Sequence, residues 1–537
     1  MISKIAAIVT LLFVSLVTTG QTLSKVWVAD NGDGTYKNPV IHADYSDPDA
    51  IRVGDDYYLI SSSFNNAPGL PILQSKDLVN WKIIGHALPQ QSPIEHFSKV
   101  QHGNGVWAPS IRYHNNEFYI YYPDPDFGIY LTRAKNILGP WTTPVLVQEG
   151  KGLIDPCPLW DKDGKVHLVH ALAGSRAGFK SVLVVNELNT AGDKVIGDDV
   201  LVYDGHAEDA TVEGPKFYQR NNYYYIFAPA GGVGTGWQIV LRSKNIYGPY
   251  ERKVVMHQGA TTVNGPHQGA WVQTQTGEDW FLHFQDKDAY GRVVHLQPMK
   301  WINDWPVIGT DADGDGNGEP VPVYKKPNTG KKFPVITPQE SDEFNGNTLG
   351  LQWQWAANPK LNWAYCYPVM GALRFNSIIK PDTAKNLWDI PNLLTQKFPA
   401  EEFSATVKFL FTPKTNGEKF GLVVMGMSYA GMALTKKEDG VYLSYAICID
   451  AEHGRPEAEK EIKKIPAGDF YFKVTVHKEA ICTFSYSSDG KNFTGIDDNF
   501  KAVPGKWIGA TLGLYCTRTQ KINDAGFADV DWFRIEK

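Results

Sequence analysis

A unit of about 50 to 60 residues repeats five times between positions 36 and 322, and this repeat constrains the fold more than any other feature of the chain. Each unit has an aromatic-rich strand, preceded some ten residues earlier by a short slot beside proline or glycine. Runs with helical periodicity are almost absent from this region. We therefore expect an all-β, five-bladed β-propeller with four short strands in each blade. The equivalent positions in the aromatic strands are Tyr57, Phe118, His167, Tyr224 and Phe281.

The residues in the slots indicate what such a propeller does. In chain order they are Asp47, Trp107, Asp155, Glu213 and His267. An aspartate beside proline is ordinarily a turn residue, but three acids at the same point of three repeats favour a shared task. We expect the aromatic strand to be the first strand of its blade and to line the central channel. The slots just before it then open at one end of the channel, around a common pocket.

Carboxyl groups that converge from different blades suit the hydrolysis of a glycosidic bond. One carboxylic acid protonates the leaving oxygen, and a second carboxylate activates water or attacks the sugar carbon. An inverting enzyme must also hold a water molecule, so its two carboxyls lie roughly 6.5–9.5 Å apart. A third carboxylate nearby raises the pKa of the acid by repulsion between like charges and can orient it. Three acids from three blades therefore favour an inverting glycosidase. Beside them, we expect Trp107 and Phe64 to form walls for a sugar, with packing between blades as the alternative.

The slot motifs resemble those of glycoside hydrolase family 43. Its members are inverting enzymes, mainly exo-acting β-xylosidases and α-L-arabinofuranosidases, and its two-domain members are similar to nearly the whole of this chain. The resemblance implies that Asp47 is the general base, Glu213 the general acid, and Asp155 the residue that tunes the pKa of the acid and orients it. The motifs that carry it are Ser46-Asp47-Pro48-Asp49, Gly105-Val106-Trp107-Ala108-Pro109, Ile154-Asp155-Pro156 and Val212-Glu213-Gly214-Pro215.

The resemblance also implies roles for two further residues. His267 matches a histidine deep in the propeller that contacts a water or a metal, and Arg292 matches an arginine that contacts the substrate. Two positions depart from the family pattern. Asp49 stands where the family often has serine or alanine, and Cys157 follows closely behind Asp155. Both departures are expected to alter specificity without removing a catalytic group.

The preferred reading of the function is removal of terminal α-L-arabinofuranose from side chains of plant cell-wall glycans of the arabinoxylan, xyloglucan or arabinan type. The region at residues 65–69, just after Phe64, lacks the bulky aromatic residue of many dedicated xylosidases, and this favours arabinose. The alternative within the class is a β-xylosidase acting on xylo-oligosaccharides. The alternative from another class is a carbohydrate-binding propeller without catalysis. No organic cofactor is required by the proposed chemistry.

The rest of the chain predicts a second domain. After the propeller at residues 24–322, residues 323–338 are rich in lysine, proline and glycine, as a linker is. Residues 339–537 show alternating strands and predict a concanavalin-like or jelly-roll-like β-sandwich. Glu343 and Asp531, near its two ends, are expected to meet and hold a structural Ca²⁺. Residues 311–320 resemble part of an EF-hand, but Pro322 replaces the glutamate of position twelve, so a surface turn is favoured there.

The N-terminal residues predict export. Lys4 precedes an apolar run from Ile5 to Val17, and small residues follow near Gly20, so residues 1–20 are interpreted as a cleaved signal peptide. The periplasm is the expected location, with secretion as the alternative. A net charge of −6 without a basic stripe gives no support to nucleic-acid binding, and no membrane insertion is expected. The five cysteines are scattered and favour buried free thiols, with one disulfide in the C-terminal part as the alternative. The oligomeric state is left open.

Overall fold

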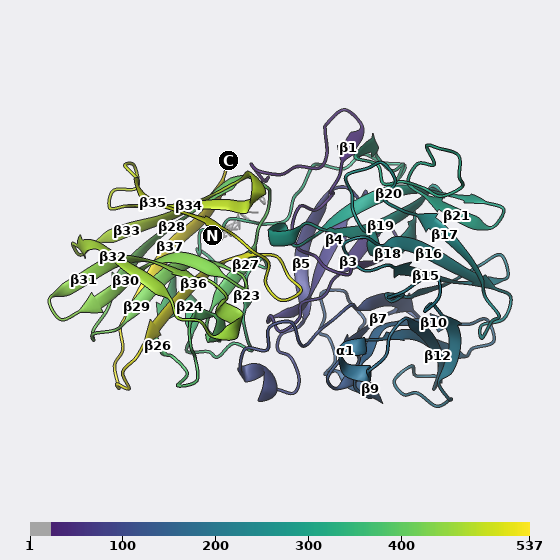
Figure 1. Cartoon of the computed structure of the whole chain (residues 1–537), viewed down its shortest axis with the longest axis horizontal. Coiled ribbons are helices and arrows are strands. Elements are labelled where there is room, and N and C mark those ends of the chain that lie inside the picture. The colour runs from purple at the N-terminus through teal and green to yellow at the C-terminus, as the bar shows by residue number, and fades with distance from the viewer. Residues whose placement is uncertain (1–22) are drawn as a thin grey trace, which may run out of the picture.

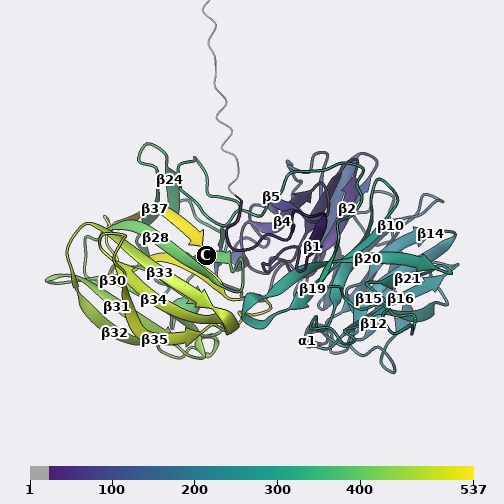
Figure 2. The ribbon, with the colours of Figure 1, turned by 90° about the horizontal axis from the view of Figure 1, so that it is seen from above.

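The computed structural model describes residues 23–537, so the predicted signal peptide lies outside the described residues. The chain forms two β-rich lobes, a propeller at the right of Figure 1 and a sandwich at the left, and they remain side by side in Figure 2. This architecture confirms the predicted fold class. Only one short α-helix, α1 (Gly174–Ala177), occurs among the described residues.

Five four-stranded antiparallel sheets follow one another along the propeller, and each is built from one continuous stretch of chain. Blade one contains β2 (Asp49–Val53), β3 (Asp56–Ile60), β4 (Gly69–Ser75) and β5 (Trp81–Leu88). Blade two contains β6 (Ser110–His114), β7 (Glu117–Asp124), β8 (Gly128–Ala134) and β9 (Val145–Glu149). Blade three contains β10 (Leu153–Trp160), β11 (Val166–Leu172), β12 (Val182–Leu188) and β13 (Val200–Asp204). Blade four contains β14 (Lys216–Arg220), β15 (Tyr223–Ala230), β16 (Trp237–Ser243) and β17 (Glu251–Met256). Blade five contains β18 (His267–Gln273), β19 (Asp279–Asp286), β20 (Arg292–Ile302) and β21 (Trp305–Ile308).

The predicted strand order within each blade was wrong by one strand. The aromatic strands β3, β7, β11, β15 and β19 are the second strands of their blades, and each pairs with an earlier strand that begins near the slot. These first strands, β2, β6, β10, β14 and β18, approach one another around the axis. The ten residues between slot and aromatic strand hold this inner strand, which is too short and irregular to stand out in the sequence. The slots consequently lie even closer to the axis than expected.

The two ends of the propeller segment are held together by strand pairing. The strand β1 (Thr35–Lys37) pairs with β22 (Val323–Lys325), so the first residues of the predicted linker are a strand. Ile41 also forms an antiparallel bridge with Val294 of blade five. These pairings join residues before blade one to residues in and after blade five, and thereby close the ring.

The second lobe is a sandwich of two mainly antiparallel sheets; the pairing of β26 with β36 is parallel. Alternation along β33, whose buried residues include Phe470, Phe472, Val474 and Val476, shows how one face of a strand enters the apolar core of the sandwich. One sheet runs in the order β23 (Gln354–Trp355), β27 (Leu394–Lys397), β36 (Thr511–Arg518), β29 (Lys419–Met425), β30 (Tyr429–Lys437), β31 (Gly440–Cys448) and β32 (Ala458–Ile465), and β26 (Ile378–Ile379) also pairs with β36. The other runs in the order β24 (Ala364–Tyr367), β25 (Ala372–Asn376), β37 (Phe527–Glu536), β28 (Phe403–Thr412), β33 (Asp469–His477), β34 (Ile481–Ser487) and β35 (Thr494–Lys501).

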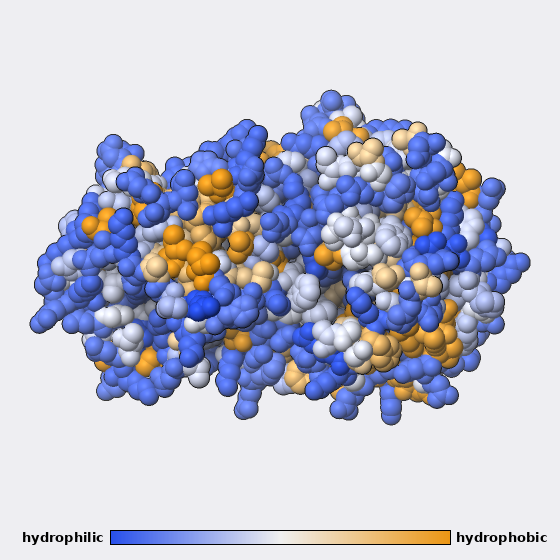
Figure 3. All heavy atoms as spheres, in the orientation of Figure 1, coloured by the Kyte–Doolittle hydropathy of each residue, from blue (hydrophilic) through white to orange (hydrophobic). Residues whose placement is uncertain are grey.

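The surface in Figure 3 is mainly hydrophilic over both lobes, with apolar groups in small patches. Among residues 23–537, no helix has the length and apolar character needed to cross a membrane. All five cysteines are free thiols, and Cys157, Cys448, Cys482 and Cys516 are buried, while Cys366 is partly exposed. The expectation of free rather than paired cysteines therefore agrees with the structure.

Candidate active site

The starts of the inner strands build a small pocket at one end of the propeller channel. Asp47, Trp107, Asp155 and Glu213 all line it, although they come from four different blades. The pocket has a volume of about 110 Å³, far below the several hundred Å³ of pockets for drug-sized ligands. A cavity of this size suits one sugar ring rather than a length of chain. The register of the repeats thus brings the three predicted acids to one place.

Asp47 is fixed from two sides. Asp47 lies two positions before β2 and has a φ of 54°. Aspartate tolerates this left-handed conformation better than most residues. The Ser62 hydroxyl donates to Oδ2 at 2.5 Å, and Nη1 of Arg292 donates to Oδ1 at 3.1 Å and to Oδ2 at 3.3 Å. Because Asp47 is buried, these charge-assisted contacts hold its carboxylate in one orientation.

Asp155 is buried beside Glu213. It lies at a bulge in β10 with a φ of 58°, and its Oδ2 accepts the backbone N–H of Gly214 at 2.7 Å. Burial, followed by the negative charge of Glu213, raises the pKa of Asp155 to about 8. The hydrogen bond from Gly214 and the charge of the buried Lys216 oppose this increase. The two carboxyl groups are therefore electrostatically linked, which is what the predicted tuning role of Asp155 requires.

Glu213 is the more open member of this pair, with a quarter of its side chain exposed. The fully buried His267, at the start of β18, places Nε2 only 2.9 Å from Oε1 of Glu213. His267 does not itself line the pocket; its neighbour Gln268 does. His267, the fifth slot residue, therefore holds Glu213 in place; its assignment as a substrate-binding residue that contacts a water or a metal is not supported by the lining of the pocket.

Aromatic side chains from both lobes form the apolar walls. Phe64 and Trp107 line the pocket as predicted, together with Trp507 from the loop between β35 and β36 of the sandwich. The rings of Trp107 and Trp507 meet edge to face with centroids 6.0 Å apart, and the indole N–H of Trp107 donates to the carbonyl of Gly103 at 2.7 Å. The second domain is consequently part of the sugar pocket.

The segment at residues 65–69 points away from the pocket. Ala67 forms an antiparallel bridge with Trp355 of the sandwich, and the side-chain amide of Asn65 donates to the carbonyl of Ala356 at 2.8 Å. No residue of the segment lines the sugar pocket. The missing aromatic residue in this segment therefore carries no information about the sugar, because Trp507 supplies bulk from elsewhere in the chain.

Asp49 and Cys157, the two residues that depart from the family motif, both contact Arg112. Nη1 of Arg112 donates to Oδ2 of Asp49 at 2.7 Å, and Nη2 lies 2.7 Å from Sγ of Cys157. Asp49 and Cys157 do not line the sugar pocket. They hold the guanidinium of Arg112, which lines the other end of the channel, so the structure places them away from the walls of the sugar pocket.

The expected calcium ligands of the sandwich bind cationic side chains instead. Glu343 accepts from Nε and Nη2 of Arg534 at 2.7 and 2.8 Å, and Asp531 accepts from Nζ of Lys408 at 2.7 Å. Glu343 and Asp531 also both raise the pKa of Arg534. A guanidinium thus supplies the positive charge between the two carboxylates, and their arrangement gives calcium no support.

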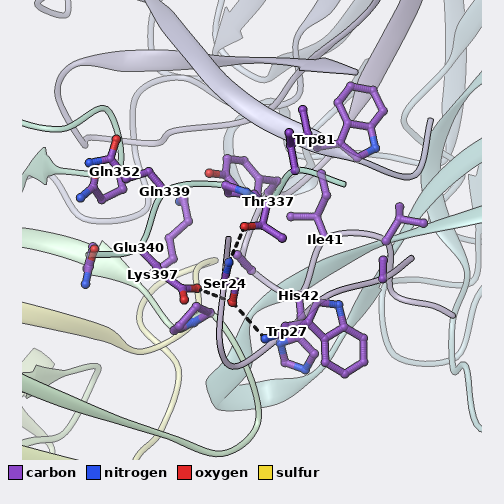
Figure 4. A pocket seen from close by; sticks show the side chains of 18 of the residues that line it. Ser24, Trp27, Ile41, His42, Trp81, Thr337, Gln339, Glu340, Gln352 and Lys397 are labelled. Atoms are coloured by element: carbon purple, nitrogen blue, oxygen red, sulfur yellow. Dashed lines mark hydrogen bonds between the residues drawn. The ribbon is translucent and has the colours of Figure 1, made fainter. Parts of the chain in front are cut away.

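A second cavity, shown in Figure 4, lies at the junction of the two lobes. Ser24, which precedes the propeller, is hydrogen-bonded to the segment that follows it. Its N–H donates to Oγ1 of Thr337 at 2.9 Å, and its hydroxyl donates to Oε2 of Glu340 at 3.0 Å. Burial raises the pKa of Glu340 to about 7. None of the three slot acids lines this cavity. It belongs to the domain junction and not to the chemistry.

Four contributors to the pocket and its acids were absent from the sequence prediction. They are Ser62, Val233, Gln268 and Trp507. Gln268 directly follows the slot residue His267, so the repeats could have predicted that it lies at the pocket. Trp507 was not, because it belongs to another domain and to no repeat. Arg292, named only from the resemblance, does line the pocket.

Comparison with known proteins agrees with this geometry. Residues 36–306 match the family described as Glycosyl hydrolases family 43, and residues 341–536 match the Beta xylosidase C-terminal Concanavalin A-like domain. A putative beta-xylosidase of Xylanibacter ruminicola is 38% identical over 499 residues, covering 93% of this chain and 89% of that protein. A beta-xylosidase of Formosa agariphila is 33% identical, with 94% and 91% covered. The non-reducing end alpha-L-arabinofuranosidase BoGH43B of Bacteroides ovatus is 28% identical, with 96% and 97% covered. The chain therefore belongs to glycosyl hydrolase family 43.

Proposed function

We propose that this protein is an exo-acting, inverting β-xylosidase that releases terminal xylose from xylo-oligosaccharides of plant cell walls. The observation that carries the proposal is the small pocket in which Asp47, Asp155 and Glu213 converge beside aromatic walls. A pocket that holds one ring favours attack at a chain end. The names of the Xylanibacter ruminicola and Formosa agariphila relatives, which are 38% and 33% identical to this chain, support xylose as the sugar.

The proposed reaction is a single displacement. Asp47, held by Ser62 and Arg292, takes a proton from the attacking water. Glu213, held by His267, gives its proton to the leaving oxygen. Asp155 keeps Glu213 in place through its contact with the backbone of Gly214, and its buried carboxyl beside Glu213 links the protonation of the two groups.

Removing one group at a time separates the two catalytic roles. Asp47→Asn is expected to lower kcat by about 10²- to 10⁴-fold on every substrate, as the loss of a general base does. Glu213→Gln is expected to do the same on xylobiose but to retain far more activity on 4-nitrophenyl β-xyloside, whose leaving group needs little protonation. Proton NMR of the first-formed sugar should show inversion at the anomeric carbon. Full activity of both variants would refute the assignment.

Arabinofuranose is the second candidate sugar. The Bacteroides ovatus relative, named as an arabinofuranosidase, aligns over almost the whole chain, and the slot acids do not separate the two pentoses. Comparing kcat/KM on 4-nitrophenyl β-xylopyranoside and on 4-nitrophenyl α-L-arabinofuranoside decides between them. A higher value on the arabinofuranoside would restore the preference drawn from the sequence.

A further inference from the structure

The propeller channel has a second mouth at the opposite ends of the same inner strands. This far mouth has a volume of about 450 Å³, roughly four times that of the sugar pocket. No residue of the sandwich contributes to it, and no carboxylate lines it. It is therefore a separate site that lacks the acids needed for glycoside hydrolysis. Its walls are the segments 50–52, 112–114, 158–160, 217–219 and 271–273.

Aromatic rings are fixed in place around the far mouth. Trp160 stacks on His114 with centroids 4.7 Å apart and planes 13° apart. Trp271 meets Tyr218 edge to face at 5.3 Å. The side chain of Tyr113, which is 40% exposed, rests on the ring of Phe118 at 4.7 Å. Rings that neighbours already immobilise lose little freedom when a ligand stacks on them.

Several polar atoms of the aromatic rings at the far mouth form no hydrogen bond with the described part of the protein. Among the described residues, no hydrogen-bond partner engages the hydroxyl of Tyr113, the imidazole of His114 or the indole N–H of Trp160. Each of these groups thus combines a fixed apolar face with an unused hydrogen-bonding atom. A sugar ring has the complementary character, because its C–H face stacks on aromatic rings while its hydroxyls form hydrogen bonds at the edge.

The two arginines at the far mouth already have partners for their guanidinium groups. Arg112 is neutralised by Asp49 at 2.7 Å. Arg52 donates from Nε to the carbonyl of Gln273 at 2.8 Å and from Nη1 to the carbonyl of Gly54 at 2.9 Å. Neither guanidinium offers the free fork that recognises phosphate or carboxylate.

We propose that the far mouth is a second carbohydrate-binding site, which holds a neutral oligosaccharide chain without cleaving it. Tyr113 and Trp160 are its anchoring residues. A polysaccharide bound at the far mouth stays close to the enzyme. Its chain ends then reach the sugar pocket at a higher effective concentration than free chains would. The inference does not depend on the sugar that the pocket cleaves.

The test compares Tyr113→Ala and Trp160→Ala with the unchanged protein in affinity electrophoresis through gels containing soluble arabinoxylan, arabinan or xyloglucan. At least one polysaccharide should retard the unchanged protein. Each variant should weaken that retardation by about fivefold or more, as truncating an anchoring aromatic does. Tyr247→Ala, which removes another partly exposed tyrosine outside both pockets, serves as the matched control and should change nothing.

Hydrolysis of the aryl glycosides is measured in parallel and should stay within about twofold of the unchanged protein, which also shows that both variants fold. Tyr113→Ala keeps the test valid if Trp160→Ala destabilises β10, because Tyr113 is exposed. Retardation equal to that of the unchanged protein, or absent for every polysaccharide, would overturn the proposal. Lack of aryl-glycosidase activity would instead count against the proposed function alone.

Discussion

At the scale of single residues, backbone conformation singles out two of the slot acids. Asp47 and Asp155 have φ values of 54° and 58°. Such conformations cost about 1–3 kcal/mol each and tend to occur where function needs them. The repeat register was enough to predict that Asp47, Asp155 and Glu213 meet. It could not predict Trp507, because a single aromatic residue in a distant loop leaves no periodic signal.

The raised pKa of Asp155 predicts that replacing it stabilises the protein at alkaline pH. The folded state holds this proton up to about pH 8, whereas an unfolded aspartate releases it near pH 3.9. Stability is therefore lost progressively as pH rises from about 4 to 8. Asp155→Asn has no proton to lose and should therefore be more stable than the unchanged protein at pH 8. Its kcat should fall, because the carboxyl group that is linked to Glu213 is gone.

Thermal melts between pH 4 and pH 9 measure this effect. The difference in Tm between Asp155→Asn and the unchanged protein should be near zero at pH 4 and should grow towards pH 8. Asp49→Asn is the control. Asp49 is also buried, but it is paired with Arg112, so its replacement should destabilise the protein. A constant difference in Tm across the pH range would contradict the assigned electrostatics.

At the scale of elements, two loops from different lobes hold Arg292 in place. The carboxylate of Asp44 accepts the N–H of Arg292 at 2.9 Å and the N–H of Gly509 at 3.1 Å, so it joins residues 286–292 to residues 504–510. Ala510 also donates to the carbonyl of Ala289 at 2.7 Å. Sequence alone does not separate this aspartate from an ordinary turn residue. Its real partners lie hundreds of residues away, beyond the reach of any local pattern.

This contact predicts that a single methyl group on the sandwich impairs the propeller. A Cβ added at Gly509 would lie 2.6 Å from the backbone nitrogen of Gly291, which cannot rotate away. Gly509→Ala should therefore shift Arg292 and Asp47 and lower kcat/KM by about tenfold or more. Gly495→Ala in the same domain, where a Cβ meets nothing within 4 Å, should leave it unchanged. Equal kcat/KM values for the two variants would show that the loop contact is irrelevant to the site.

At the scale of the whole molecule, the sequence predicted two domains but not how they dock. Main-chain hydrogen bonds run both ways between Ala67 and Trp355, at 3.0 and 2.6 Å. The side chain of Asn358 pairs with both the N–H and the carbonyl of Gln91, at 2.8 and 2.9 Å. These residues belong to loops and to a two-residue strand, which carry no periodicity to reveal them. The docked lobes should consequently behave as one cooperative unit.

We expect the unchanged protein to unfold in a single calorimetric transition, and Asn358→Ala to divide it. Asn358 and Gln91 are both buried, so the variant leaves two buried backbone groups unpaired at a cost of about 2 kcal/mol. Asn376→Ala removes one hydrogen bond within the sandwich, to the carbonyl of Asn362, and should retain one transition. Glycosidase activity of Asn358→Ala should disappear with the first transition, because separation of the lobes withdraws Trp507 from the pocket. Two transitions in the unchanged protein, or activity that outlasts the first transition, would show that the propeller works without its partner domain.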